Sequence, residues 1–210
     1  MIDPLKLIKS INSGCKNLFY SNFILIPYSG HHNSSFYRIE GTSTALNRFE
    51  IPYEPVKVLH WFNDFWLFIE IKFIRSEIVI KRKKISQIHT YVSLSVFQGE
   101  ENDSLKYQLF RAEWDDYFNP DEKHSQPHWH ITSNQAIERT FEEYSSSFDN
   151  GDFISLLEQE KKKVLDVNKI HFAINGNWQN DETHIHKIDN EDRVVKWLQG
   201  ILLHIRTELE

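Results

Sequence analysis

The chain of 210 residues contains a single cysteine, Cys15, and only seven glycines. One cysteine excludes an internal disulfide and a cysteine-based zinc site, and it is typical of proteins in a reducing cytoplasm. No apolar run approaches the roughly 18 to 20 residues that cross a bilayer, because Glu70 and Lys72 interrupt the longest one, 65–74. The first residues carry no basic segment followed by an apolar one, so we expect no signal peptide. These absences predict a cytoplasmic protein without a membrane partner.

Several familiar catalytic motifs are also missing. The sequence holds no Walker loop, no Gly-x-Gly-x-x-Gly, no Gly-x-Ser-x-Gly and no His-Glu-x-x-His. The sequence therefore gives no support to four classes of enzyme: nucleoside triphosphatases, dinucleotide-dependent enzymes, α/β-hydrolases and zincins. The net charge of -6 argues against nonspecific binding of nucleic acid over the whole surface.

What is present is ample material for a core. Hydrophobic residues make up 40% of the chain and aromatic residues 14%, and the length suits one domain. Few glycines together with many isoleucines, asparagines and lysines are typical of an AT-rich bacterial genome.

Hydrophobic periodicity predicts the order of the elements. Residues 1–14 form an N-terminal helix, with Asp3 as N-cap, Pro4 in the first turn and Gly14 as its end. Residues 15–132 are mainly β, because segments such as 65–73 and 87–97 alternate apolar and polar side chains. Residues 133–210 are mainly helical and end in an amphipathic helix. The sequence predicts a single α+β domain over 1–210, an antiparallel β meander packed against helices.

The segment 126–132 is the most informative, since three of the eleven histidines fall within seven residues at His124, His128 and His130. In a strand, His128 and His130 project from the same face. Such a pair can converge on one divalent ion, Zn²⁺ or Mn²⁺, at about 2.0–2.1 Å. The remaining metal ligands would come from His124, Asp115, Asp116 and His171. In the alternative interpretation Trp129 is the buried residue and both imidazoles lie on a solvated face. Both interpretations stay open.

Two family resemblances touch these residues. His128-Trp129-His130-Ile131-Thr132 resembles the motif of histidine-triad nucleotide hydrolases, with Thr132 in place of the third histidine. That resemblance implies attack on a phosphate by the middle histidine, here His130. Over a longer stretch, antiparallel strands followed by an Arg-x-x-x-Asp element (Arg111 to Asp115), His-x-His and a C-terminal helix resemble small bacterial toxins of toxin–antitoxin loci. This second resemblance implies a prokaryotic defence system and an RNA-directed activity.

Two functions from different classes follow. The first is a cytoplasmic interaction or regulatory subunit of a bacterial defence or toxin–antitoxin-like system, whose protein partner would contact aromatics from the stretch 61–68. The second is a phosphodiester-directed enzyme, an RNase or nucleotide hydrolase, with His130 as nucleophile or general base and His128 as its partner or as a metal ligand. The basic runs 81–84 and 161–163 would track the phosphates of RNA or a nucleotide, or else lie on solvated surface.

Overall fold

The computed structural model describes residues 2–49, 53–80, 83–104, 106–116, 127–131 and 188–210. Helix α1 spans Pro4–Cys15 and a short 3₁₀ helix, η1, spans Lys16–Leu18. The strands are β1 (Leu25–His31), β2 (Ser34–Ile39), β3 (Ser43–Asn47), β4 (Glu54–Phe62), β5 (Phe65–Ile80), β6 (Lys83–Gln98), β7 (Tyr107–Asp115) and β8 (His128–Ile131). Helix α4 spans Glu191–Leu209. The helices expected between 134 and 165 lie outside the described residues.

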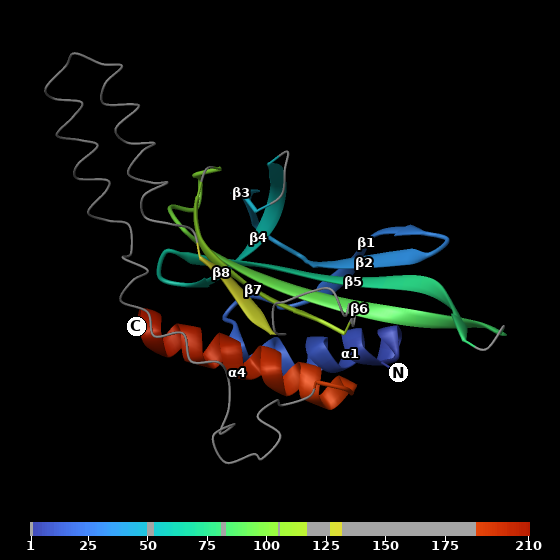
Figure 1. The fold of residues 1–210 in the computed structure, drawn as a ribbon. Helices are drawn as coiled ribbons and strands as arrows, with labels where there is room; N and C mark the ends of the chain where they lie inside the picture. The colour runs from blue at the N-terminus through green and yellow to red at the C-terminus, as the bar shows by residue number, and fades with distance from the viewer. Residues whose placement is uncertain (1, 50–52, 81–82, 105, 117–126, 132–187) are drawn as a thin grey trace, which may run out of the picture.

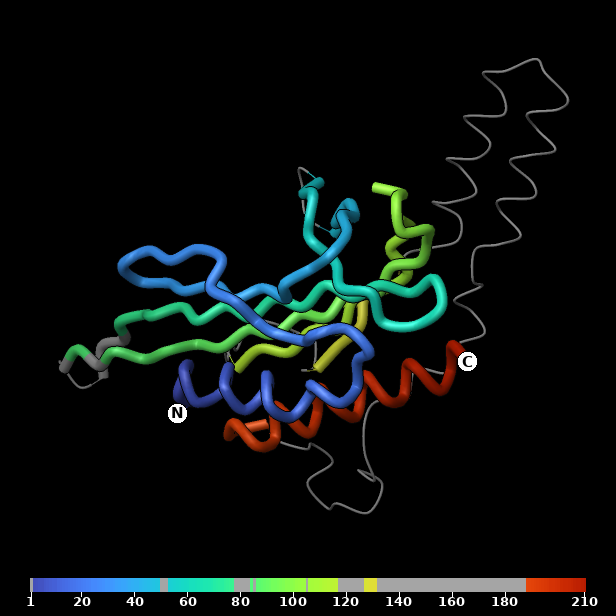
Figure 2. Tube along the Cα trace, turned by 180° about the vertical axis from the view of Figure 1, so that it is seen from behind, coloured from blue at the N-terminus to red at the C-terminus, as the bar shows by residue number. Residues whose placement is uncertain are grey.

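All strand pairings are antiparallel, and the order across the sheet is β1-β2-β5-β6-β7-β8. The hairpin β3–β4 leaves this path and joins it where β4 pairs with β5. Helices α1 and α4 lie side by side against one face of the sheet (Figure 1), as the view from behind also shows (Figure 2). The predicted α+β class, with an antiparallel sheet packed against helices, is confirmed.

Alternation along the central strands decides which face the helices cover. Ile69, Leu94 and Ala112 are partners across β5, β6 and β7, and all three are buried. On the same face Trp114 contacts Trp197 of α4, with ring centroids 6.5 Å apart. Apolar side chains at every second position are thus buried together on this face, and their burial stabilises the contact between the sheet and the helices.

Helix α1 begins as expected and ends later than expected. The Asp3 carboxylate accepts a hydrogen bond from the backbone N–H of Lys6, which satisfies one of the free donors of the first turn. Gly14 is not the end of the helix, because the helix continues to Cys15. Its carbonyl oxygen accepts a 2.7 Å hydrogen bond from Gln199 Nε2, and a Cβ here would lie 2.9 Å from Cγ1 of Val195. Gly14 therefore serves the close approach of α1 to α4.

Helix α4 follows its predicted pattern. Asn190 is the N-cap and accepts a hydrogen bond from the N–H of Arg193. One apolar stripe of the helix is buried: Val194, Trp197, Leu198, Ile201, Leu202, Ile205 and Leu209. No helix in the described ranges is long and apolar enough to span a bilayer.

The long hairpin β5–β6 differs from the sequence expectation. The alternating segment 65–73 is only part of a longer strand, because β5 runs without a break to Ile80 and pairs with β6 as far as Lys83. Likewise, β1 and β2 remain paired up to His31 and Ser34. In both hairpins the partner strand satisfies the backbone hydrogen-bonding groups close to the turn.

The β3–β4 hairpin covers one end of the face opposite the helices. A bulge in the β6–β7 pairing shifts the register between Val96 and Phe97, so Gln108 shares this second face with Ser95. Gln108 Nε2 donates to Asn47 Oδ1 at 3.1 Å, and its Oε1 accepts from the N–H of Arg48 at 2.6 Å. The end of β3 is thereby held against β7, next to the residues described below.

Candidate metal centre

The second face of the sheet carries a polar cluster where β7 meets the short strand β8. Glu113 lies directly across from His128, and Arg111 lies across from His130. Trp129 points to the opposite face, where its ring packs on Phe110 with centroids 5.7 Å apart. The period of two predicted that His128 and His130 share a face, and the structure places them so.

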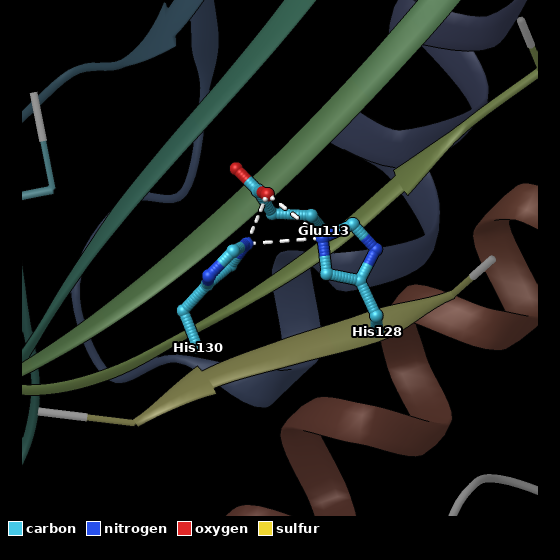
Figure 3. A group of neighbouring side chains, drawn as sticks. All are labelled: Glu113, His128 and His130. Carbon is cyan, nitrogen blue, oxygen red and sulfur yellow. Dashed lines mark hydrogen bonds and ion pairs between the residues drawn. The ribbon is translucent and has the colours of Figure 1, made fainter. Parts of the chain in front are cut away.

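Three side chains point toward one another in this cluster (Figure 3). His128 Nε2 and His130 Nε2 lie 3.0 Å apart, and Glu113 Oε2 lies 2.8 Å from the second and 3.3 Å from the first. Among the described residues, they form the group of at least three histidine, cysteine or acidic side chains whose possible ligand atoms all lie within 4.8 Å of one another. These separations suit hydrogen bonds among the three atoms, and they also suit three ligand atoms that bind one cation. The three residues lie close enough to hold a metal ion.

The triangle of donor atoms has the size expected of ligands on one side of an ion. For metal–ligand bonds of about 2.1 Å, separations of 2.8 to 3.3 Å correspond to angles of about 85–105° at the metal. Glu113, His128 and His130 could therefore hold one ion together. Two histidines and one carboxylate on one side of a metal form the arrangement known from open, reactive centres.

A second set of contacts fixes the carboxylate of Glu113. Its Oε1 accepts a hydrogen bond from the hydroxyl of Tyr91 and forms an ion pair with the Arg111 guanidinium, whose Nε lies 2.8 Å away. Oε2 is thereby left to face the two imidazoles. Partners of this kind orient ligands in metal sites and tune their basicity.

Burial differs among the three side chains. Glu113 is 6% exposed, whereas His128 and His130 are 20% and 38% exposed. The Phe49 ring lies 5.7 Å from the ring of His130 and 4.9 Å from the Arg111 guanidinium carbon, centroid distances that place it at the rim. The site is therefore anchored in the sheet at Glu113 and reachable from solvent at His130.

Charged side chains continue from this cluster across the same face. Lys72 Nζ lies 5.2 Å from the ring centroid of Tyr91 and 2.8 Å from Glu70 Oε1. Arg38 Nε lies 2.6 Å from the other oxygen of Glu70, and its NH1 lies 2.9 Å from Glu54. Acidic groups thus alternate with basic groups between β2 and β8.

The other residues proposed as ligands fall elsewhere or outside the described chain. Asp115 lies two residues further along β7 and is not part of the group of three. Asp116 accepts a 2.8 Å hydrogen bond from the N–H of Thr90, and its Oδ1 lies 3.7 Å from His89 Nδ1. His124 and His171 lie outside the described residues.

Sequence reasoning missed Glu113. The signal that could have found it is its place in the alternating run 105–114, where it falls on the same face as Arg111 and Asp115. A glutamate on a mostly buried strand needs a partner, because an unpaired buried carboxylate is costly. Two histidines on the next strand are candidates for that partner.

Comparisons with protein-family models, with curated proteins and with solved structures found no match to this chain.

Proposed function

We propose that this chain is a metal-dependent enzyme that acts on phosphodiester bonds, in RNA or in a nucleotide. The observation that carries the proposal is the triangle of Glu113 Oε2, His128 Nε2 and His130 Nε2, with sides of 2.8 to 3.3 Å. A divalent transition metal bound there lowers the pKa of a coordinated water and stabilises developing negative charge on a phosphoryl oxygen.

The donor set narrows the metal. Imidazole nitrogens favour transition metals over Mg²⁺ and Ca²⁺, and a carboxylate suits Mn²⁺ as well as Zn²⁺. Zn²⁺ and Mn²⁺ are therefore the two ions to be tested at these three donors.

Neighbouring side chains support an anionic substrate with an aromatic group. Arg111 brings a permanent positive charge beside Glu113, and Phe49 offers a ring at the exposed rim. Arginine and aromatic side chains together suit a phosphate followed by a stacked base. Since His128 and His130 would both use Nε2 as ligand atoms, water rather than His130 is the nucleophile in this proposal.

The test combines metal binding with cleavage. We expect calorimetric titration of the metal-stripped chain with Mn²⁺ and with Zn²⁺ to show one site, which His130→Ala and Glu113→Gln each abolish. Loaded wild-type protein should cleave a short single-stranded RNA or bis-p-nitrophenyl phosphate, and both variants should lose that activity about 100-fold or more. His31→Ala, a change at the exposed histidine that ends β1, is the matched control.

Two results would count against the enzyme. Wild-type protein that binds neither ion would remove the metal centre. Cleavage that survives chelation but depends on His130 would instead favour a metal-free mechanism with the two imidazoles as acid and base.

The alternative is an interaction or regulatory subunit of a bacterial defence or toxin–antitoxin-like system. The aromatics expected to offer a partner surface, Trp61, Phe62, Phe65, Trp66 and Phe68, are all buried. Exposed apolar side chains do occur where η1 meets the end of α4, at Tyr20 and Leu203. This alternative predicts that His128→Ala and His130→Ala leave activity in the host system intact, whereas Leu203→Glu abolishes binding to the partner.

A further inference from the structure

A second cluster of reactive side chains lies on the same face as Glu113, beyond Tyr91 along the β5–β6 hairpin. Ser76 Oγ on β5 lies 2.8 Å from His89 Nε2 on β6. The other ring nitrogen, Nδ1, lies 3.7 Å from Asp116 Oδ1, just after β7. A hydroxyl on β5, an imidazole on β6 and a carboxylate just after β7 are therefore neighbours, the last two at ion-pair distance.

The acidic member of this group is held in place by the backbone. Asp116 Oδ1 accepts from the N–H of Thr90, and the N–H of Asp116 donates to the Thr90 carbonyl at 3.1 Å. Thr90 adjoins His89 in β6, so the two hydrogen bonds keep the carboxylate beside the imidazole. Burial raises the pKa of Asp116, an effect that its contacts with Thr90 and His89 oppose.

From this geometry we propose that Ser76, His89 and Asp116 form a nucleophilic site that takes carboxylic esters with a small apolar acyl group. The site is separate from the metal centre and does not depend on it. A histidine within hydrogen-bond reach of a serine can act as its general base, and a carboxylate at the far nitrogen orients the ring.

The reaction would proceed in two balanced steps. Ser76 Oγ attacks the ester carbonyl carbon while its proton passes to His89 Nε2, and that proton then goes to the departing alkoxide. Water next attacks the acyl carbon and gives one proton to Nε2. Ser76 Oγ leaves and takes that proton back, so the net reaction is hydrolysis of the ester to acid and alcohol.

The surroundings fit a small acyl group. Ile74 lies directly across from His89, and 45% of it is exposed. Ser76 is half-buried, and the His89 side chain is 12% exposed. An apolar acyl chain can rest on Ile74 while the carbonyl carbon approaches Ser76 from the open side.

The experiment is covalent labelling of the full chain with a fluorophosphonate probe, followed by intact-mass measurement and peptide mapping. We expect one adduct on Ser76, which Ser76→Ala abolishes. Ser86→Ala removes an exposed serine of the same hairpin and should label like wild type. His89→Ala should lower the labelling rate about 100-fold or more, and added imidazole should restore part of it.

Two further measurements separate this site from the metal centre and from a purely structural role. Labelling should persist in EDTA, and p-nitrophenyl acetate should be hydrolysed by wild type but not by Ser76→Ala. An unlabelled wild-type protein, an adduct that persists in Ser76→Ala, labelling that EDTA abolishes, or His89→Ala labelling at the wild-type rate would each overturn the proposal.

Discussion

At the scale of single residues, the carboxylate of Glu113 divides its two oxygens between different partners. Oε1 accepts a hydrogen bond from the Tyr91 hydroxyl and forms an ion pair with Arg111, and Oε2 faces His128 and His130. A carboxylate held in this way presents one lone pair in a fixed direction. In the proposed metal centre, its neighbours would therefore help to determine the affinity for the ion without contacting it.

Replacing the hydroxyl of Tyr91 tests this division. We expect Tyr91→Phe to weaken Mn²⁺ binding about 10- to 100-fold, because one donor that orients Glu113 is lost while the three ligands remain. Calorimetric titration measures the change. Tyr53→Phe, at an exposed tyrosine, should bind as wild type does. Equal affinities in wild type and Tyr91→Phe would show that the hydroxyl does not position the ligand.

Asp116 gives a prediction about pH. Burial raises its pKa above the ordinary value of 3.8, so the folded state holds this proton more tightly than the unfolded state. Stability is therefore lost as pH rises from about 4 through the raised pKa. Asp116→Asn carries no such charge, so its free energy of unfolding relative to wild type should improve between about pH 4 and pH 7. Urea denaturation at both pH values measures this, and a constant difference would contradict it.

The sequence predicted part of the candidate site and missed part, for a physical reason. The shared face of His128 and His130 follows from the period of a strand, which is a local property. The meeting of Glu113 with these histidines depends on the register between β7 and β8, which pairs Glu113 with His128. No local pattern contains that register.

At the scale of elements, the contact between α1 and α4 depends on a position without a side chain. Gly14 lets Gln199 reach its carbonyl oxygen, and Val195 occupies the space of the missing Cβ. A glycine within a helix costs about 1 kcal/mol relative to alanine, so its presence here fits a packing role.

Filling that space should be unfavourable. We expect Gly14→Ala to lower the free energy of unfolding by about 1 kcal/mol, because overpacking against the stiff Val195 outweighs the gain in helix propensity. Chemical denaturation measures the change. The double variant Gly14→Ala/Val195→Ala should lose less stability than the two single changes predict together. A single variant more stable than wild type would show that the helices can separate without cost.

The same scale explains which elements could be predicted. The faces of β5 and β6 were predicted correctly, since burial of one face fixes alternation in the sequence. The unbroken course of β5 to Ile80 was not, because beyond Ile74 the strand pairs only with the opposite arm of its own hairpin, and no local pattern in the sequence specifies that pairing.

At the scale of the whole molecule, the sheet is covered on one face by helices and at one end of the other face by the β3–β4 hairpin. Lys106 joins this hairpin to the sheet and is fully buried. Its ammonium donates to Ser43 Oγ at 2.8 Å and to the carbonyl of Thr44 at 3.3 Å, and it lies 4.6 Å from the ring centroid of Trp66. The charge is thus surrounded by oxygen acceptors and an aromatic face.

Removing the Lys106 ammonium should weaken the attachment of the β3–β4 hairpin to the sheet. We expect Lys106→Met to destabilise the fold by about 1–3 kcal/mol, because buried carbonyl groups lose their donor while the volume is nearly kept. Thermal denaturation measures the loss. Lys57→Met, at an exposed position on β4, is the control and should change little. If the two variants were equally stable, the buried ammonium would not be what holds the hairpin.

The proposed metal centre joins β7 to the short strand β8, so ion binding there would affect the stability of β8. In the described part of the chain, β8 has four residues and pairs with β7. An ion bound by residues of both strands would stabilise β8 in its pairing with β7. The size of this stabilisation would depend on the ion concentration. A ligand whose concentration is 100 times its dissociation constant adds about 2.7 kcal/mol to the free energy of unfolding. Hydrogen exchange of the β8 amides should therefore slow when Mn²⁺ is added. The amides of β1, at the opposite edge of the sheet, should exchange as before. The concentration of available metal would then determine the local stability of the β8 edge.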